Sequence, residues 1–280
     1  MPLPTEFFKM SAAGNDFILF DGRAGSPPAE EVADQARRLC ARALSVGADG
    51  VIVVGPSNRA DIRATFYNPD GGLTFCGNGG RCAARLAFLQ GMAPARMTVE
   101  TIKGVLRAEI TGSDVAFEMP APSGLEEGVS VEAAGRTWSG LRVDTGVPHF
   151  VTFIDAPMRG AIEPIAVGLR RHPRFGAEGT NVNFVHAPDS GTWVIRTYER
   201  GVEAETLACA TGCTAAALAL AIAGRARPPI TLCTQSGRTL TIRFEGDPRR
   251  AEGLRVEGEA RLVFVGHLAD EAVRGIPTGA

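Results

Sequence analysis

The same series of landmarks occurs twice along this chain. Each half carries a glycine before a short β-like run, then a second glycine, then a cysteine among small residues. The landmarks are Gly14, Gly47 and Cys76 in the first half, and Gly146, Gly179 and Cys209 in the second. The two glycines are 33 residues apart in both halves, and the cysteine follows 29 or 30 residues later. This repeat predicts two domains of one fold that arose by duplication.

Short β-like runs alternate with a few helical segments in both halves. Helices are expected at 29–45, 80–90, 163–171 and 212–224. Strands are expected at 16–20, 50–54, 60–67, 149–154, 181–186, 192–198, 239–245 and 260–266. The segment 119–129 is rich in proline, glycine and acidic residues, which predicts a crossing between the halves. We therefore predict one domain at 1–121 and another at 122–267.

The composition argues against several classes of protein. The 280-residue chain has a net charge of −2, which gives no basic field for nucleic acid or anionic lipid. It contains no run of eighteen apolar residues, and its N-terminus lacks the pattern of a signal peptide. We therefore expect a cytoplasmic protein with no membrane partner, in which the six cysteines are free thiols.

Cys76 and Cys209 have matched surroundings. Each precedes small residues that lead into an alanine-rich helix, in FCGNGGRCAARLAF and ACATGCTAAALAL. At the start of a helix, unpaired N–H groups and the helix dipole favour a thiolate. Two thiols on opposite sides of a carbon acid could invert it, because one removes a proton and the other returns one to the opposite face. The same backbone amides could hold a substrate carboxylate.

Other interpretations of this cysteine–glycine stretch are weaker. A zinc site would need four ligands at short spacing, whereas five and three residues separate the two cysteines in each half. A phosphate loop would need the Walker pattern and its lysine. Cys82 and Cys213, like Cys40 and Cys233, are expected to be inert buried thiols. A non-catalytic protein that binds amino acids would have no use for the paired cysteines.

Seven stretches of the chain resemble the diaminopimelate epimerase family. They are FFKMSAAGNDF, GADGVIVV, FYNPDG, CGNGGRC, DTGVPHFV, GTNVNFV and IRTYERGVEAETLACATG, in order from residue 7 to residue 212. The resemblance implies an α/β (α+β) fold of two pseudo-symmetric domains from an internal duplication. Each domain would be a mostly antiparallel sheet wrapped around a central helix, with the active site in the interdomain cleft. It also implies a homodimer, and a tail (268–280) that returns to the first domain.

The resemblance assigns roles in the site position by position. The acid–base pair is Cys76 and Cys209, with His149 and Glu199 assisting proton transfer. The backbone donors that hold the reacting carboxylate are Gly77, Asn78, Ala210 and Thr211. The polar substrate contacts are Asn15, Asn68 and Asn181, and the distal amino-acid end is bound by Glu199 and Arg200. The family requires neither a metal nor a cofactor.

Two positions depart from the family pattern. Ala210 stands where the family usually has glycine, which is tolerable only if this residue avoids a left-handed conformation. Val147 stands where many members carry asparagine, and this removes one polar contact to the substrate. Without the resemblance, His149 could equally be a structural histidine, and Glu199 with Arg200 an ordinary surface ion pair.

The sequence therefore predicts an isomerase that acts on a small amino acid. The expected reaction interconverts LL-2,6-diaminopimelate and meso-diaminopimelate by two-base proton transfer between thiolate and thiol. It would serve lysine and peptidoglycan precursor synthesis. The nearest alternative is a proline or hydroxyproline racemase of the same fold. Glu199 and Arg200, together with the three asparagines, favour a substrate that has a second charged end.

Overall fold

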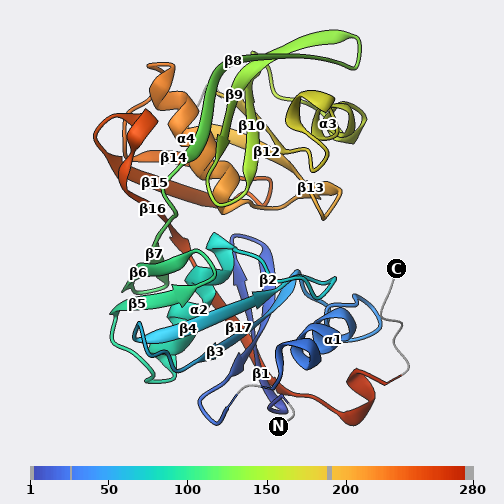
Figure 1. The fold of residues 1–280 in the computed structure, drawn as a ribbon, viewed down its shortest axis with the longest axis vertical. Coiled ribbons are helices and arrows are strands. Elements are labelled where there is room, and N and C mark those ends of the chain that lie inside the picture. Colours follow the sequence, from blue (N-terminus) through green and yellow to red (C-terminus); the bar gives the residue numbers. More distant parts are fainter. Residues whose placement is uncertain (1–2, 26, 188–190, 275–280) are drawn as a thin grey trace. The chain divides into compact units, whose positions relative to one another are not determined.

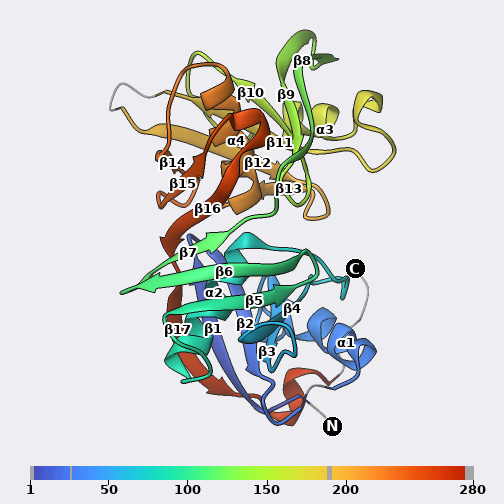
Figure 2. The ribbon, with the colours of Figure 1, turned by 60° about the vertical axis from the view of Figure 1, so that its left-hand side comes forward.

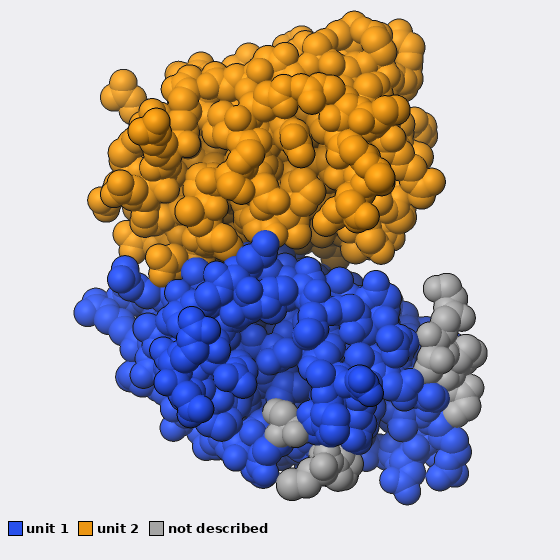
Figure 3. Space-filling view, in the orientation of Figure 1, with its two compact units in different colours: residues 1–117, 259–280 blue, residues 118–258 orange. Residues whose placement is uncertain are grey.

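The computed structural model describes residues 3–25, 27–187 and 191–274. The chain divides into two compact units (Figures 1 and 3). Unit 1 contains Met1–Phe117 together with Glu259–Ala280, and unit 2 contains Glu118–Gly258. The chain therefore passes from unit 1 to unit 2 once and returns once.

Unit 1 is a mixed sheet with two helices. Its elements are β1 (Glu6–Ala12), β2 (Asn15–Asp21), α1 (Ala29–Leu39), β3 (Gly50–Gly55), β4 (Ile62–Tyr67), α2 (Gly77–Leu89), β5 (Arg96–Thr101), β6 (Gly104–Thr111), β7 (Asp114–Glu118), β17 (Arg261–His267) and the 3₁₀ turn η3 (Asp270–Ala272). The strands pair in the order β17-β1-β2-β3-β4-β5-β6-β7. Only β2/β3 and β4/β5 are parallel pairs, and each is joined through a helix.

Unit 2 repeats this plan. Its elements are β8 (Ser123–Ala133), β9 (Arg136–Asp144), β10 (Pro148–Phe153), α3 (Glu163–Arg170), η1 (Pro173–Phe175), β11 (Asn181–His186), β12 (Trp193–Glu199), β13 (Ala204–Thr206), α4 (Ala210–Ile222), β14 (Ile230–Cys233), β15 (Thr239–Glu245), η2 (Pro248–Arg250) and β16 (Glu252–Glu259). The parallel pairs are β10/β11 and β12/β14, joined through α3 and α4. The shared order of pairings confirms the duplication that the sequence repeat predicts.

One helix of each unit lies inside its curled sheet (Figures 1 and 2). Helix α2 packs against β1 to β6, and helix α4 packs against β9 to β12 and against β14 and β15. Every residue of α4 from Ala210 to Leu220 is buried. A helix that is apolar on all sides is stable only when it is enclosed, and its many alanines let the strands approach closely. This confirms the predicted sheet around a central helix.

The other two helices cover the opposite faces of the sheets. Helix α1 carries acidic residues in its first turn and Arg37 and Arg38 in its last, which suits the helix dipole. Its buried side chains join a core with Phe20, Val51 and residues of β1 and β4. Helix α3 packs in the same way on a core that contains Trp138 and Phe184. None of the described helices is long and apolar enough to cross a membrane.

The described residues form nine strands that the sequence analysis does not predict, namely β1, β5, β6, β7, β8, β9, β13, β14 and β16. The structure also differs from the sequence prediction in the following ways. Helix α1 ends at Leu39 rather than at residue 45, because Ala43 and Gly47 adopt positive φ angles. The segment read as a crossing, 119–129, contains the first half of strand β8. Strand β17, which the sequence places in the second half, pairs with β1 of unit 1. Residues 268–274 of the tail also lie in unit 1, and 275–280 fall outside the described residues.

Candidate active site

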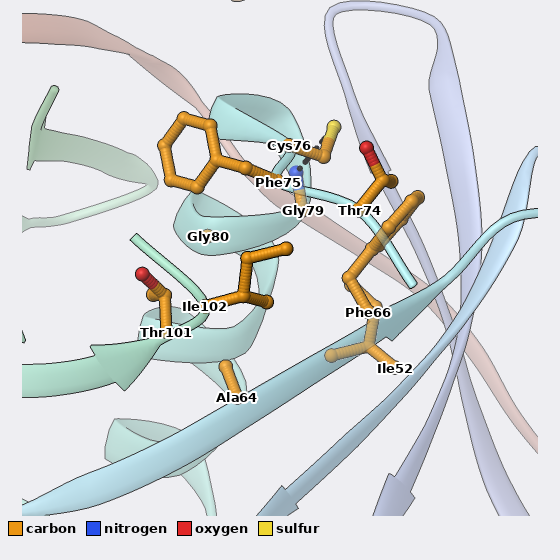
Figure 4. A pocket seen from close by; sticks show the side chains of 10 residues that line it. All are labelled: Ile52, Ala64, Phe66, Thr74, Phe75, Cys76, Gly79, Gly80, Thr101 and Ile102. Carbon is orange, nitrogen blue, oxygen red and sulfur yellow. Dashed lines mark hydrogen bonds between the residues drawn. The ribbon is translucent and has the colours of Figure 1, made fainter. Parts of the chain in front are cut away.

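Cys76 is the residue that caps the N-terminus of α2. It has an extended backbone (φ −139°, ψ 116°), and its Sγ accepts a hydrogen bond from the N–H of Gly79 at 3.3 Å (Figure 4). Gly77 and Asn78 follow as the first two helical residues. The first N–H groups of a helix point out of its N-terminus. Aligned N–H groups and the dipole at this end favour negative charge on the sulfur and on a bound carboxylate.

Asn15, the first residue of β2, connects this cap to Asp49, which directly precedes β3. The Cys76 thiol donates to Asn15 Oδ1 across 3.7 Å, and Asn78 Nδ2 donates to the same oxygen across 3.1 Å. Asn15 Nδ2 donates to Asp49 Oδ2 at 2.7 Å, which fixes the orientation of the amide. The side chain of Asn15 is therefore held with its oxygen toward the thiol.

Charged residues hold Asp49 in turn. Arg42 bridges the carboxylates of Asp16 and Asp49, at 2.5 and 2.8 Å, and Lys9 forms an ion pair with Asp16 at 2.6 Å. Burial alone would raise the pKa of Asp16, but Arg42 and Lys9 hold it below its usual value. Asp16 therefore remains ionised at neutral pH. Asn15 and Asp49 link Cys76 to this ionic network.

A small pocket lies beside Cys76 in unit 1 (Figure 4). It is lined mainly by apolar side chains, including Ile52, Phe66, Phe75 and Ile102. Its volume is about 20 Å³, which is room for little more than one water molecule. This volume is smaller than an amino acid.

Cys209 caps α4 with nearly the same geometry. Its backbone is extended (φ −125°, ψ 110°), and its Sγ accepts from the N–H of Gly212 at 3.4 Å. Ala210 and Thr211 are the first two helical residues, and Ala210 is not among the residues with positive φ. Ala210 therefore avoids the left-handed conformation, as the sequence analysis requires for alanine at this position.

A buried chain of hydrogen bonds leads away from Cys209. The Sγ atom lies 3.3 Å from Thr211 Oγ1, which lies 2.9 Å from His149 Nε2. His149 Nδ1 then lies 3.0 Å from Asn183 Nδ2. All four side chains are buried. Burial, with a contribution from Arg200, lowers the pKa of His149 to about 3, so its imidazole is neutral at physiological pH.

Glu199, Arg200 and Asn181 lie near this chain. Burial and the charge of Glu199 raise the pKa of the Cys209 thiol, whereas the Thr211 hydroxyl and the Gly212 N–H lower it. Glu199 Oε1 accepts from Thr206 at 2.6 Å. Asn181 Oδ1 accepts from the backbone N–H of Arg200 at 2.7 Å, which ties the end of β12 to the start of β11.

The structure thus places most of the predicted residues in two clusters. Unit 1 gathers Cys76, Gly77, Asn78 and Asn15, and unit 2 gathers Cys209, Ala210, Thr211, His149, Asn181, Glu199 and Arg200. Asn68 stands apart. Its backbone closes the turn at 68–72, and within the described part of the chain its side chain forms no hydrogen bond.

Two residues of these clusters are missing from the sequence prediction, Asp49 and Asn183. A signal for each was present. Asp49 occupies the position in the repeat that corresponds to Asn181, two residues after the second glycine landmark. Asn183 lies two residues after Asn181 in a strand, where alternate residues share one face.

The other cysteines in or beside the helices do not cap a helix N-terminus. Burial raises the pKa of Cys82, within α2, to about 12, and raises that of Cys40, which follows α1, to about 12. Cys213 is also buried. No group of three or more possible metal-ligating side chains is present among the described residues.

Comparison with known proteins identifies the family. The model of the diaminopimelate epimerase family matches residues 7–123 and 141–263. The diaminopimelate epimerase of Aquifex aeolicus is 36% identical over 280 residues, which cover 96% of this chain and 99% of that protein. The diaminopimelate epimerase of Archaeoglobus fulgidus is 42% identical over 233 residues, which cover 78% and 81% of the two chains.

Solved structures of other racemases and epimerases have the same fold. A probable proline racemase from Agrobacterium radiobacter K84 superposes with a TM-score of 0.74 at 15% identity, over 98% of this chain and 95% of that one. A hydroxyproline epimerase from Agrobacterium vitis gives 0.68 at 17% identity, over 95% and 92%. The fold is thus shared with distant racemases, while the full-length sequence match is specific: the chain belongs to the diaminopimelate epimerase family.

Proposed function

We propose that this protein interconverts LL- and meso-diaminopimelate, with Cys76 and Cys209 as the two acid–base groups and without a metal or cofactor. One observation carries the assignment of the pair. The two cysteines cap pseudo-equivalent helices, and each sulfur accepts the N–H of the third helical residue. Stereoinversion at a carbon needs a proton acceptor on one face and a donor on the other, and the duplication supplies both.

The proposed step is a balanced proton exchange. The thiolate of one cysteine takes the α-proton, which forms an S–H bond and leaves the electron pair of the broken C–H bond in an enediolate. The thiol of the other cysteine gives its proton to the opposite face of the carbon and becomes a thiolate. The reverse reaction uses the same groups with their roles exchanged.

The first helical N–H groups bind the carboxylate in this proposal. The N–H groups of Gly77 and Asn78 on α2, and those of Ala210 and Thr211 on α4, would hold the reacting carboxylate and stabilise the enediolate. His149, which is neutral at pH 7, would assist by donating a hydrogen bond rather than by carrying charge.

The polar residues around the two caps would bind the rest of the substrate. Asn15, Asn68 and Asn181 would contact its polar groups, while Glu199 and Arg200 would pair with the distal ammonium and carboxylate. A substrate with only one charged end would leave this pair unused. This supports diaminopimelate over proline as the substrate.

Proton exchange in deuterated water tests the proposal. LL-diaminopimelate incubated with the protein should gain deuterium at the α-carbon and yield the meso isomer, whereas proline should remain unchanged. Cys76→Ala and Cys209→Ala should each abolish isomer interconversion. Mild oxidation should join the two cysteines and abolish activity, and reductant should restore it. Interconversion that persists in either alanine variant would rule out the two-thiol mechanism.

We also propose that the protein is a cytoplasmic homodimer that serves lysine and peptidoglycan precursor synthesis. Three consecutive apolar residues of β17, namely Val263, Phe264 and Val265, are 47–52% exposed. An apolar strand of this kind is a suitable surface for a second copy of the chain. Light scattering should give a molar mass of twice the 29.4 kDa of one chain. The double variant Val263→Lys, Val265→Lys should give the mass of a single chain.

A further inference from the structure

Asn183 is a fully buried polar residue next to the proposed acid–base group of unit 2. Both ends of its side-chain amide are used. Its Nδ2 lies 3.1 Å from the backbone oxygen of Phe150 and 3.0 Å from His149 Nδ1. Its Oδ1 accepts the hydroxyl of Thr197 at 3.1 Å. The strand β11 on which it lies is buried along its whole length.

The carbonyl of Phe150 fixes which way this amide points. A carbonyl oxygen only accepts hydrogen bonds, so the nitrogen of Asn183, rather than its oxygen, faces it. The second hydrogen of that nitrogen is directed to His149 Nδ1, which therefore accepts. A neutral imidazole that accepts at Nδ1 carries its proton on Nε2.

This tautomer sets the direction of the next two hydrogen bonds. The Nε2–H group of His149 donates to Thr211 Oγ1 at 2.9 Å. The Thr211 hydroxyl then directs its own hydrogen elsewhere, and Cys209 Sγ lies 3.3 Å away. Asn181 Nδ2 lies 3.5 Å from the same Nε2, farther than Thr211 Oγ1 at 2.9 Å. The oxygen of Asn181 accepts the N–H of Arg200, so Asn181 does not accept the Nε2 proton and Thr211 Oγ1 is its acceptor.

We propose that Asn183 is a positioning residue for the epimerisation, which holds His149 in the Nε2–H tautomer so that Thr211 donates to the Cys209 sulfur. The inference rests on the proposed role of Cys209 as an acid–base group. After Cys209 gives up its proton it must carry negative charge, and a hydroxyl that already points at the sulfur stabilises that charge. In the other tautomer Thr211 would donate to Nε2, and the sulfur would lose this donor.

The surroundings of Cys209 disfavour its thiolate, and the Thr211 hydroxyl counteracts them. Glu199, at the end of β12, and Cys213, one turn further along α4, both disfavour a thiolate at Cys209, and burial does so most strongly. The opposing groups are the Gly212 N–H and the Thr211 hydroxyl. Arg200 acts on His149 and favours its neutral form. A correctly oriented hydroxyl thus offsets part of the cost of ionising Cys209.

Nitrogen-15 NMR of protein labelled at histidine tests the tautomer directly. The signal of His149 is assigned by comparison with His149→Gln, since the chain has only four histidines. In the wild-type protein at pH 7 we expect a proton on Nε2 and none on Nδ1. In Asn183→Asp, whose carboxylate can only accept, we expect a proton on Nδ1. A proton on Nδ1 in the wild-type protein would overturn the inference, even if the variant failed to fold.

Alkylation of Cys209 tests the consequence. In a Cys76→Ser background, the rate of reaction with iodoacetamide at pH 8 should fall about tenfold in Asn183→Leu, because a hydrogen bond to a charged group is lost. Tandem mass spectrometry separates Cys209 from Cys213, which share the tryptic peptide 201–225. The matched control is Thr152→Val. It removes a partly buried hydrogen bond of the same strand as His149, from Thr152 to the backbone oxygen of Ser139, and should leave the rate unchanged.

Neither readout requires turnover. An unchanged alkylation rate in folded Asn183→Leu protein would overturn the inference, and so would an equal loss in Thr152→Val. A protein that shows the expected tautomer and rates but no deuterium exchange with diaminopimelate would instead overturn the proposed function. The experiments therefore distinguish a failure of the inference about Asn183 from a failure of the proposed epimerase function.

Discussion

Cys76 and Cys209 cap their helices with the same geometry, but different residues surround and hold the two sulfurs. Cys76 is half-buried, and its neighbour Asn15 is anchored to the ionic network of Asp49, Arg42 and Asp16. Cys209 is 6% exposed and is followed by the neutral chain of Thr211, His149 and Asn183. The duplication has kept the helix cap at both sulfurs, whereas the residues that hold each cap in place, here called its support, have diverged.

The two supports also differ in polarity. Asn15 presents an oxygen to Cys76, which favours the thiol as donor. Thr211 presents a hydroxyl to Cys209, and with His149 in the Nε2–H tautomer this group favours the thiolate. Burial and Glu199 act in the opposite direction at Cys209. The difference indicates that the two thiols are tuned by separate means, ionic in unit 1 and by oriented neutral dipoles in unit 2.

The largest difference between the two supports should appear at the glycines whose N–H groups bind the sulfurs. A Cβ at Gly212 would lie 2.5 Å from Asn183 Oδ1. The Asn183 amide cannot shift easily, because hydrogen bonds to His149, Phe150 and Thr197 hold it in place. A Cβ at Gly79 would lie 3.1 Å from Ile52 Cδ1 and Phe66 Cδ2, which can yield slightly. We expect Gly212→Ala to lower kcat/KM about 100-fold through misplaced groups, and Gly79→Ala to lower it by less than about tenfold.

Steady-state epimerisation assays on the two alanine variants provide the measurement. Circular dichroism and urea midpoints serve as controls, because alanine also favours helix over glycine by about 0.5–1 kcal/mol. Equal losses of activity in the two variants would show that the supports do not differ in rigidity.

The next prediction concerns the stability of unit 2 in acid. The pKa of His149 falls from an ordinary 6.5 to about 3 on folding, so the unfolded chain binds a proton that the folded chain does not. Its contribution is complete above pH 6.5 and is lost as the pH falls toward 3. Between pH 7.5 and 5.5 the free energy of unfolding should drop by about 1.4 kcal/mol from this residue alone.

Tryptophan fluorescence in urea isolates this effect, because both tryptophans, Trp138 and Trp193, lie in unit 2. The measurement compares the wild-type protein with His149→Gln at the two pH values. The pH-dependent loss should be smaller in the variant by the stated amount. The same loss in both proteins would mean that folding does not lower the pKa of His149.

The sequence predicted the caps more fully than their supports. The spacing of the repeat located Cys76 and Cys209, and the runs of small residues predicted the enclosed helices. Asp49 and Asn183 act through side chains that meet only after strands from distant segments pair, as Asn183 meets His149 across β11 and β10. Local pattern carries little information about such contacts. The early end of α1 was missed for a similar reason, since Ala43 adopts a positive φ that alanine rarely shows.

A smaller effect is expected from the ionic support of unit 1. Asp49→Asn removes the pair with Arg42 and weakens the charge-assisted bond to Asn15. We expect kcat/KM to fall about three- to tenfold, with the alkylation rate of Cys209 unchanged. The matched control is Asp61→Asn. It removes an exposed carboxylate that binds Thr98 in the same unit and should leave kcat/KM unaltered. A change in Cys209 reactivity in Asp49→Asn would contradict the separation of the two supports.

The smallest effect should follow from restoring the residue that the family usually has at the start of α4. Ala210 keeps the backbone N–H that the proposed carboxylate site needs, and it is not among the residues with a left-handed backbone, so glycine offers it no conformation that it lacks. Ala210→Gly should therefore leave kcat/KM within about twofold and lower stability by at most about 1 kcal/mol. Gly77 is the corresponding residue of α2, and Gly77→Ala is the opposite substitution. If the two caps are equivalent, it should also leave kcat/KM within about twofold. A large gain in activity for Ala210→Gly would show that the cap of unit 2 must move during the reaction, and that the likeness of the two caps holds only for the resting protein.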